Sequence, residues 1–373
     1  MNPGPRFGIE EEYFLTDLDT RQMLAEPSKN LLHECRETVG RSFAYEMFQG
    51  QIEVASPVFT STDQAADFFH NVRSQLNRTL AAHGLGLLCA GTHPLARWRE
   101  QRATAQPHFD SLFGEYQSVA QRSVLCGLHV HVEVPEDVDR ITIMNAVIPW
   151  LPLLLLLSCS SPFWEGADSG FMSYRQVVCE GWPRMGLPEH FKDEGEYRRF
   201  LALLRRTGAM EADGNGWWGL RPAIRYPTLE LRMTDACPRL SETVLLATLF
   251  RVMVAFAISA ARPCAGHDPA TRWLLEENRW QAKRHGAQGR FVMDAEGAVM
   301  NARQWLDQAR TTFEDTAVRM GEPRLFDQAQ AVLLAGNSAE RQRACHARAS
   351  ARLFEPALCM QQVVDLLLQE SRG

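Results

Sequence analysis

Four short segments of the sequence carry acidic or histidine residues at every second position. Successive side chains of a β-strand point to opposite faces of a sheet, so residues two apart share a face. The residues in between are mostly Ile, Leu, Val and Met, which suits a strand with one face on a core. One face of the predicted sheet therefore carries carboxylates, imidazoles and an arginine, and this charge needs cations. The polar residues are Glu10 and Glu12, then Glu53, then His129, His131 and Glu133, and finally Glu230 and Arg232.

Carboxylates on a shared face can hold hard divalent cations. Mg²⁺ takes oxygen ligands at about 2.0–2.1 Å and bridges phosphate oxygens. Glu10 and Glu12 would lie roughly 6.5–7 Å apart along a strand, so we expect them to contact different ions. Glu53 is expected to complete a site from a neighbouring strand. The alternatives are a solvated edge strand for the first pair and an ordinary half-exposed acid for Glu53. Glu11 points to the apolar face, where we expect a buried, paired structural acid.

Two histidines in the pattern H-x-H also fit a zinc hydrolase, which needs further His or Asp ligands at other strand ends. The other histidines fall mainly in predicted helices and loops, which weakens that alternative. The sequence contains no Gly-rich phosphate loop of the P-loop type. None of its nine cysteines lies in a recognisable nucleophile motif, so cysteine catalysis is not expected.

Composition limits the classes of protein to consider. The 373 residues are 45% hydrophobic and 23% charged, as in ordinary globular proteins, and the net charge of −6 argues against nucleic acid as a partner. Nine scattered cysteines without a CxxC pair indicate reduced thiols and the cytoplasm. The apolar run of residues 146–157 is shorter than the roughly 20 residues of a membrane span. Pro149 and Pro152 interrupt this run. We therefore expect a buried helix and no membrane partner.

Hydrophobic periodicity predicts the elements that must position the polar residues. Helices are predicted over residues 63–83, 109–123, 135–158, 194–207, 240–261, 270–284, 302–320, 338–348 and 355–369. Strands are predicted over residues 7–16, 48–56, 85–90, 127–134, 217–220 and 228–233, with a short return strand near 22–24. The long loop-rich segment of residues 160–190 is typical of a functional loop. No repeat or linker divides the chain, so we predict one domain of residues 1–373. Its class would be α+β, with a mainly antiparallel sheet and helices on the far face.

Six segments resemble, in order, the glutamate–cysteine ligases of the second type, a family of carboxylate–amine ligases. They span residues 7 to 235 and are FGIEEEY (7–13), QIE (51–53), GLHVH (127–131), SYR (173–175), GWPRMGLP (181–188) and YPTLELRMTD (226–235). Glutamine synthetases are more distantly similar, with E-x-E, G-M-H-x-H and E-x-R strands of their own. This wider resemblance implies a catalytic sheet that forms an open funnel, with Mg²⁺ ions and ATP phosphates over its charged face. Residues 239–373 are mostly helical and carry no such motif.

The resemblance implies a reaction in which ATP activates a carboxylate as an acyl phosphate and an amine then displaces phosphate. L-Glutamate and L-cysteine are the first-choice substrates, with another amine as the alternative acceptor. Two or more Mg²⁺ ions are implied, with Mn²⁺ as a substitute. Arg232 would meet the transferring phosphate with two hydrogen bonds, or else pair with a nearby glutamate. The implied metal ligands are Glu10, Glu12, Glu53, His129 and Glu230, and His131 and Glu133 are further residues that could contact metal or phosphate.

Four arginines lie in predicted loops or strand ends, and one should receive the substrate α-carboxylate. They are Arg175, Arg184, Arg221 and Arg225, with Arg175 as the first choice and Arg184 on a possible lid. Trp217 and Trp218 would line a pocket or belong to the core.

The sequence departs from plant-type glutamate–cysteine ligases, which are distantly similar. There a second acid follows the strand equivalent to residues 51–54, whereas this chain reads SPVFT over residues 56–60. One metal site is therefore expected to be built differently or to be weaker. Two other functions stay open: a metal-dependent amidohydrolase on γ-glutamyl amides, and a non-catalytic nucleotide or amino-acid sensor. A homodimer could form through sheet edges or through the helical C-terminal third.

Overall fold

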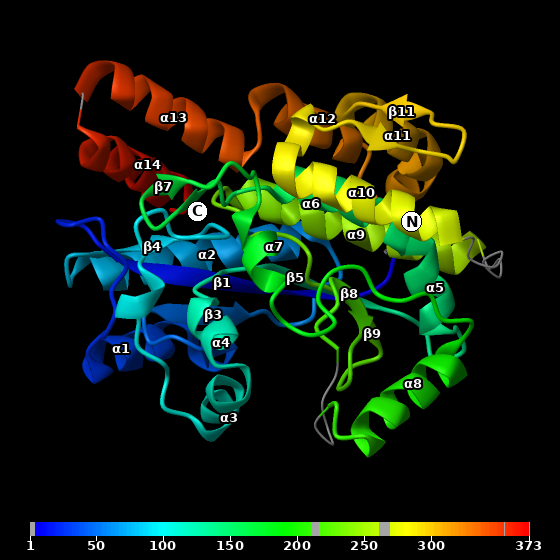
Figure 1. Ribbon diagram of the computed structural model, residues 1–373, viewed down its shortest axis with the longest axis horizontal. Coiled ribbons are helices and arrows are strands. Elements are labelled where there is room, and N and C mark those ends of the chain that lie inside the picture. Colours follow the sequence, from blue (N-terminus) through cyan, green and yellow to red (C-terminus); the bar gives the residue numbers. More distant parts are fainter. Residues whose placement is uncertain (1–3, 211–215, 261–268, 354, 373) are drawn as a thin grey trace.

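The computed structural model describes residues 4–210, 216–260, 269–353 and 355–372. An open seven-stranded sheet occupies its centre, with the strand order β2-β3-β1-β5-β9-β8 and with β4 paired to β1 (Figure 1). Every neighbouring pair is antiparallel. The predicted α+β class with an antiparallel sheet is thereby confirmed. The strands are β1 (Phe7–Asp17), β2 (Phe43–Tyr45), β3 (Gln51–Ala55), β4 (Leu85–Leu88), β5 (Leu128–Glu133), β8 (Leu220–Pro222) and β9 (Thr228–Leu231).

The register of the sheet brings the polar residues of separate segments side by side. On one side of β1, Glu12 is opposite Glu53 of β3. On the other side, Glu10 is opposite His129 of β5. His131 of β5 is in turn opposite Glu230 of β9. The period-two pattern of each strand therefore places these side chains on one face of the sheet.

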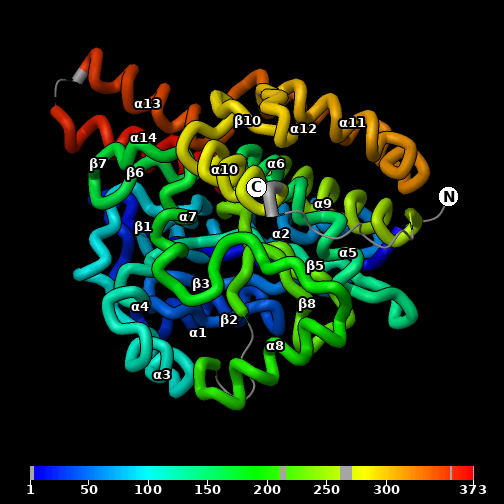
Figure 2. The backbone as a smooth tube through the Cα atoms, turned by 45° about the vertical axis from the view of Figure 1, so that its right-hand side comes forward, coloured from blue at the N-terminus to red at the C-terminus, as the bar shows by residue number. Residues whose placement is uncertain are grey.

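Helices cover the opposite, apolar face. Helix α2 (Thr62–Ala81) packs on β4, and α9 (Leu240–Ala260) packs on β5 and α2. The C-terminal helices lie together above the sheet in both views (Figures 1 and 2). These helices are α10 (Pro269–His285), α11 (Ala302–Arg319), α12 (Leu325–Ala335), α13 (Ser338–Leu353) and α14 (Pro356–Glu370).

Glu11 points into the layer between the sheet and these helices, as the sequence predicts. Its carboxylate accepts hydrogen bonds from Arg73 of α2 at 2.6 and 3.0 Å and from the Thr243 hydroxyl of α9 at 2.7 Å. The side chains of Arg73 and Glu11 are 0% and 1% exposed. The hydrogen bonds of Glu11 thus connect α2 and α9 to the central strand β1.

Several predicted helices are shorter or divided. The helix expected over residues 135–158 is split into α5 (Arg140–Val147) and α6 (Leu151–Ser158) by a 3₁₀ turn at Ile148–Trp150, because Pro149 and Pro152 lack the N–H that a continuous helix needs. The helix expected over residues 109–123 breaks at Gln117, whose φ is 47°, into α3 (Pro107–Tyr116) and α4 (Ser118–Arg122). Helix α8 (Glu194–Arg206) follows the prediction closely.

Other elements differ from the sequence prediction. The strand expected over residues 217–220 begins only at Leu220, and the return strand near 22–24 is a single bridge between Thr16 and Met23. Elements that the sequence does not predict include α1 (Lys29–Val39), β2, α7 (Tyr174–Cys179) and α12. Two small hairpins complete the chain, formed by β6 (Phe163–Trp164) with β7 (Ala167–Asp168) and by β10 (Phe291–Val292) with β11 (Val299–Met300).

Two helical stretches, Arg140–Ser158 and Leu240–Ala260, are long and apolar enough to cross a membrane by length and composition alone. Their most apolar windows are 78% and 67% buried inside the structure, as in core helices. The eight cysteines in the described part of the chain are free thiols, and all but Cys345 are buried. Cys264 lies outside the described residues, as does Ala261, which ends the helix predicted over residues 240–261.

Candidate functional site

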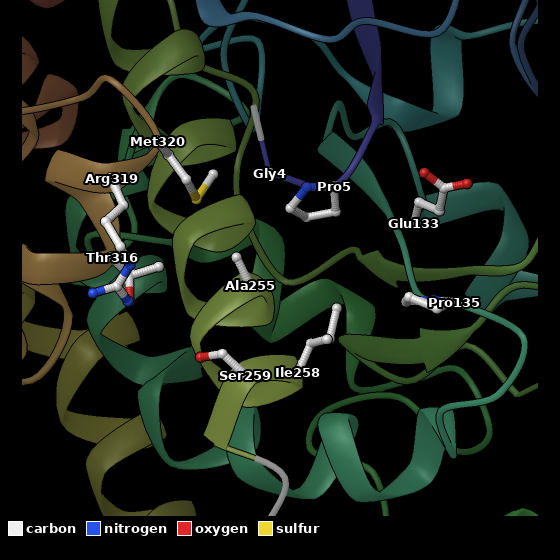
Figure 3. Close-up of a pocket in the computed structure, with 10 residues that line it drawn as sticks. All are labelled: Gly4, Pro5, Glu133, Pro135, Ala255, Ile258, Ser259, Thr316, Arg319 and Met320. Carbon is white, nitrogen blue, oxygen red and sulfur yellow. The ribbon is translucent and has the colours of Figure 1, made fainter. Parts of the chain in front are cut away.

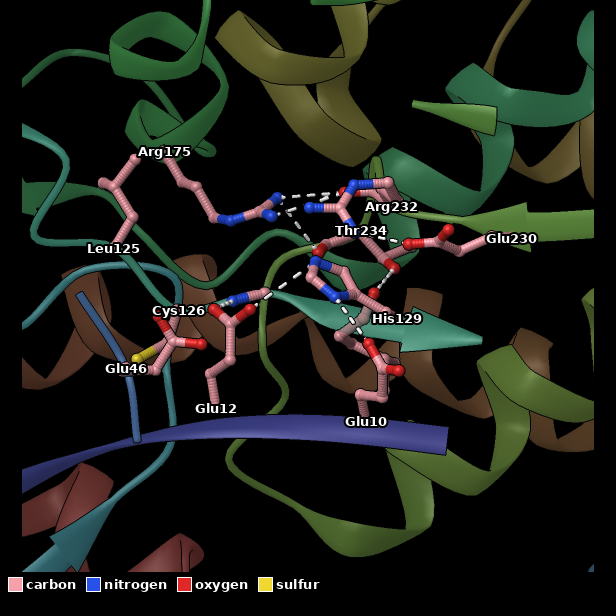
Figure 4. Close-up of polar contacts among 12 residues, drawn as sticks. Glu10, Glu12, Glu46, Leu125, Cys126, His129, Arg175, Glu230, Arg232 and Thr234 are labelled. Carbon is pink, nitrogen blue, oxygen red and sulfur yellow. Dashed lines mark hydrogen bonds and ion pairs between the residues drawn. The ribbon is translucent and has the colours of Figure 1, made fainter. Parts of the chain in front are cut away.

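The polar face of the sheet holds two groups of residues with the geometry of metal sites. In each group, one possible ligand atom per residue lies within 4.8 Å of the others. The first acidic group consists of Glu10, His131 and Glu230, from β1, β5 and β9. The second acidic group consists of Glu12, Glu46 and Glu53. Figure 4 shows Glu10 and Glu12 projecting from β1 toward His129, with Glu46 beyond Glu12 and Glu230 on the opposite side. We call the members of the two acidic groups, together with His129 and Arg232, the charged floor.

His129 lies between the two acidic groups and is a member of neither. Its Nδ1 is 3.3 Å from a Glu10 carboxylate oxygen, and its Nε2 is 3.6 Å from a Glu12 oxygen. Burial and the nearby Arg232 lower the pKa of His129 to about 4, so the ring is neutral near pH 7. The sequence assigned a metal to His129 and left His131 open, whereas the structure groups His131 with two carboxylates. His129 thus lies within reach of both glutamates of β1, and its role as a metal ligand stays a prediction.

Glu46 is the site residue that the sequence analysis did not identify. It lies one residue beyond the short strand β2, outside any alternating pattern, and the Met47 amide donates to its carboxylate at 3.0 Å. The only sequence signal is an acid next to a three-residue strand. Glu46 supplies the second group with a third carboxylate, whereas residues 56–60 contain none.

The second acidic group concentrates negative charge in a partly buried place. Burial, together with the Glu46 carboxylate, raises the pKa of Glu12 to about 8. Burial and the same neighbour raise the pKa of Glu53 well above its usual value. The Gly127 amide donates to Glu12 at 2.6 Å. Within the described part of the chain, neither Glu46 nor Glu53 has an arginine or lysine within ion-pair distance. This group therefore has the donor set of a divalent cation site, and the raised pKa values mean that its carboxylates favour protons unless a cation takes their place.

Arginines balance the first acidic group. Arg221 binds Glu230 through two nitrogens, at 2.8 and 3.1 Å, and Arg232 contacts the same carboxylate. Burial opposes ionisation of Glu230, but the two guanidinium groups outweigh it and lower its pKa. Burial of Glu10 is likewise outweighed by His129 and His131, so the pKa of Glu10 is lowered. The salt bridge considered for Arg232 is thus present, and the lowered pKa values favour ionised carboxylates at both glutamates of this group.

The remaining predicted site residues are dispersed. Arg175 is buried, and its guanidinium donates to main-chain carbonyls of residues 232–234. Arg184 is half-buried in the loop after α7, with φ at 59°. Arg225 is exposed in the turn between β8 and β9. Glu133 forms a two-bond ion pair with Arg6 at 2.5 and 2.9 Å, outside both acidic groups. Only Arg221 of the four predicted substrate arginines contacts a member of the acidic groups by a described ion pair.

The two predicted tryptophans have different surroundings. Trp218 is 2% exposed and packs among Phe191, Tyr197 and Phe200, so it belongs to the core. Trp217 is half-buried and lies 5.2 Å from the ring of Trp182 between centroids.

A cavity of about 330 Å³ opens beside the first acidic group. Tyr226 and Val58, which are 61% and 67% exposed, line it together with Glu10 and His131. The Tyr226 ring meets the His131 ring edge to face, with centroids 6.1 Å apart. A second cavity of similar volume lies between the N-terminal segment, α9 and α11 (Figure 3). Glu133 lines both cavities, but the second contains no member of the acidic groups.

Comparisons with known proteins agree with this geometry. The model of the glutamate–cysteine ligase family 2 matches residues 6–352. A Pseudomonas fluorescens protein named "Putative glutamate–cysteine ligase 2" is 58% identical over 100% of this chain and 96% of its own length. A glutamate–cysteine ligase from Francisella tularensis, solved with AMP, has a TM-score of 0.71 at 12% identity, over 99% of this chain and 89% of that one. A bifunctional glutathione synthetase from Pasteurella multocida has a TM-score of 0.73 at 14% identity, over 99% of this chain and 53% of that one.

Proposed function

Because the chain belongs to the glutamate–cysteine ligase family 2, we propose that it is an ATP-dependent carboxylate–amine ligase that joins the γ-carboxylate of L-glutamate to the amine of L-cysteine or another small amine. The γ-phosphoryl group of ATP passes to a carboxylate oxygen of glutamate, and ADP leaves. The amine nitrogen then attacks the carbonyl carbon, and phosphate leaves with that oxygen. The observation that carries this proposal is the pair of acidic groups on one sheet face, with Arg232 beside them.

The donor sets fit Mg²⁺ or Mn²⁺. Glu12, Glu46 and Glu53 offer only carboxylate oxygens, which Mg²⁺ prefers, and Glu10 and Glu230 offer two more beside His131. When bound, such ions neutralise phosphate charge and polarise the phosphoryl group that is transferred. The residues of the floor would position the two substrates so that carboxylate and phosphoryl group meet in line. AMP in the Francisella ligase of the same fold supports nucleotide use.

We expect Arg232 to bind the transferring phosphoryl group. Its guanidinium contacts Glu230 in the structure, and a planar fork can also donate two hydrogen bonds to phosphate. We expect Arg232→Ala to lower kcat by about 100-fold to 1,000-fold, with the KM for ATP changed by less than about threefold, because the contact strengthens in the transition state. Steady-state kinetics at saturating glutamate and amine measure the two constants.

The matched variant Arg232→Lys keeps the charge but loses the planar fork. It is expected to recover only part of kcat. A change confined to the KM for ATP would instead give Arg232 a role in substrate binding alone.

The cavity beside the first acidic group suits the base of the nucleotide. It adjoins Glu10 and His131, and its mouth carries the exposed Tyr226 ring. Stacking of a base on an aromatic ring contributes about 1–3 kcal/mol. Tyr226→Ala is therefore expected to raise the KM for ATP about tenfold or more and to leave kcat within about twofold. Tyr226→Phe keeps the ring and should behave like the natural enzyme. Equal KM values for ATP in the natural chain and both variants would show that the base does not bind on Tyr226.

The experiment that tests the proposed function is ADP release by the purified chain. ATP, Mg²⁺ and L-glutamate are supplied with and without a panel of amines headed by L-cysteine. ADP release that rises with one amine, together with a γ-glutamyl product identified by mass, is the expected result. No ADP release with any amine would contradict the proposal.

A second candidate is a metal-dependent amidohydrolase that acts on γ-glutamyl amides. The first acidic group favours it to a limited extent, because one imidazole and two carboxylates are also ligands that Zn²⁺ accepts. This function would show cleavage of γ-glutamyl amides without ATP, with Zn²⁺ or Mn²⁺ preferred over Mg²⁺. A sensor would bind ATP and release no phosphate.

A further inference from the structure

Asp235 is a fully buried carboxylate that lies behind the charged floor. Its Oδ2 accepts hydrogen bonds from the Ser161 hydroxyl at 2.7 Å and the Ser160 amide at 3.1 Å, and its Oδ1 accepts one from the Ser173 hydroxyl at 2.8 Å. The Arg175 guanidinium is 4.0 Å away. Asp235, Ser160, Ser161 and Ser173 are each 0% exposed, so none of them can touch a substrate.

These hydrogen bonds fix the start of α7. The Ser161 hydroxyl, oriented by Asp235, accepts from the Arg175 amide at 3.1 Å, and Ser161 and Ser173 form a parallel bridge. Asp235 thus ties two distant segments, residues 160–161 and 173–175, to the chain just beyond β9. A carboxylate can accept from all of these donors at once, which an amide or a hydroxyl cannot do.

Helix α7 in turn makes hydrogen bonds to the main chain of the charged floor. Arg175 donates to the Thr234 carbonyl at 3.1 Å and the Arg232 carbonyl at 3.3 Å, and Gln176 donates to the Met233 carbonyl at 2.7 Å. Side chains of α7 therefore donate hydrogen bonds to three successive main-chain carbonyls, those of residues 232–234. Figure 4 shows the Arg175 guanidinium directed at the main chain of Arg232 and Thr234.

The same guanidinium lies close to the second acidic group. A Cβ on Gly127 would lie 2.3 Å from Arg175 Nη2, so a side chain there would displace the guanidinium. The Gly127 amide is the group that donates to Glu12. Arg175 therefore donates to the backbone of Arg232 and lies against the glycine whose amide donates to Glu12.

We propose that Asp235 is a positioning residue of the ligase reaction, which acts through Arg175 to hold Arg232 in its working place. This inference rests on the proposed function, and it changes the role expected of Arg175 from substrate recognition to support of the floor. A misplacement of about 1 Å can cost about 100-fold in rate, so a residue without substrate contact can have a large effect.

The test is Asp235→Asn in the full chain, assayed by ADP release with ATP, glutamate and the best amine. Asparagine keeps the shape but replaces one acceptor oxygen with a donor, which faces hydroxyl and amide donors. We expect kcat to fall about 100-fold, with the KM for ATP within about threefold. Glu242→Gln is the matched control, since Glu242 is also buried and pairs with an arginine, Arg341, and it should keep kcat within about twofold.

A double-mutant cycle separates positioning from a general loss of structure. In an Arg232→Ala background, Asp235→Asn is expected to lower kcat by less than about fivefold, because the group that it positions is already missing. A full 100-fold effect in that background, or a natural kcat in the single variant, would overturn the proposal.

Two milder variants cover the case in which Asp235→Asn does not fold. Ser161→Ala and Ser173→Ala each remove one hydrogen bond to Asp235 and should lower kcat about tenfold. Unchanged kcat in both would overturn the positioning role. An unmodified chain without ATP-dependent turnover would overturn the proposed function itself, whereas an active chain with a fully active Asp235→Asn would overturn only the role of Asp235.

Discussion

Replacing Glu12 by glutamine is expected to lower kcat by about 1,000-fold while the protein stays folded. Glu12 is the central member of the second acidic group, with Glu53 opposite it across the β1–β3 pair and Glu46 within ligand distance. An amide has the same shape but offers a divalent cation no negative charge. The loss of one of three crowded carboxylates also relieves repulsion, so the free energy of unfolding should not decrease.

Glu242→Gln is the matched control for this prediction. Glu242 is also a buried carboxylate, but it pairs with Arg341 outside both acidic groups. It should keep at least about half of kcat, because its partner Arg341 is not part of the charged floor. Steady-state ADP release at several Mg²⁺ concentrations compares the two variants. Similar losses in both would contradict the assignment of the second acidic group, as would a fully active Glu12→Gln.

The largest effect on stability is expected from Arg73→Met. Arg73 is completely buried and donates to Glu11, to the Cys237 and Pro238 carbonyls and to Thr243. Methionine would leave the Glu11 carboxylate charged, buried and without its partner. The free energy of unfolding should fall by about 3–5 kcal/mol, measured by urea denaturation.

Two further variants show whether the buried pair is the cause. Adding Glu11→Leu to Arg73→Met removes the stranded charge and should restore part of the lost stability. Arg198→Met breaks the pair of an exposed arginine with Glu194 and should cost less than about 1 kcal/mol. A decrease of less than about 1 kcal/mol in the free energy of unfolding for Arg73→Met would contradict this prediction. It would show that Glu11 becomes protonated or hydrated in the variant.

The sequence predicted most of the floor because its geometry is local. A strand with polar residues two apart fixes which side chains share a face, and this put Glu10, Glu12, His131 and Glu230 together before any pairing was known. The buried partner of Glu11 was expected for the same reason, since an odd position on β1 must face the core.

The sequence could not predict what depends on strand pairing and loop paths. Glu46 joins the second acidic group only because β2 pairs with β3 and ends beside Glu53. The places of His129 and Arg175 are likewise set by neighbours that are more than 50 residues away in the chain, Glu10 and residues 232–234. The resemblance implies a metal ligand at His129, and residue type favours a substrate receptor at Arg175. Both roles stay predictions, and the structure adds the contacts that the sequence could not show.

The measurement that tests the central claim most directly is the transfer of labelled oxygen from glutamate to phosphate. L-Glutamate with ¹⁸O in its γ-carboxylate is turned over with ATP, Mg²⁺ and the amine that gives the fastest ADP release, and the released phosphate is analysed by mass spectrometry. The proposed acyl phosphate predicts that each phosphate carries one oxygen atom from glutamate. Phosphate without label, formed while ADP and the amide product accumulate, would contradict activation of the carboxylate by phosphoryl transfer on this floor.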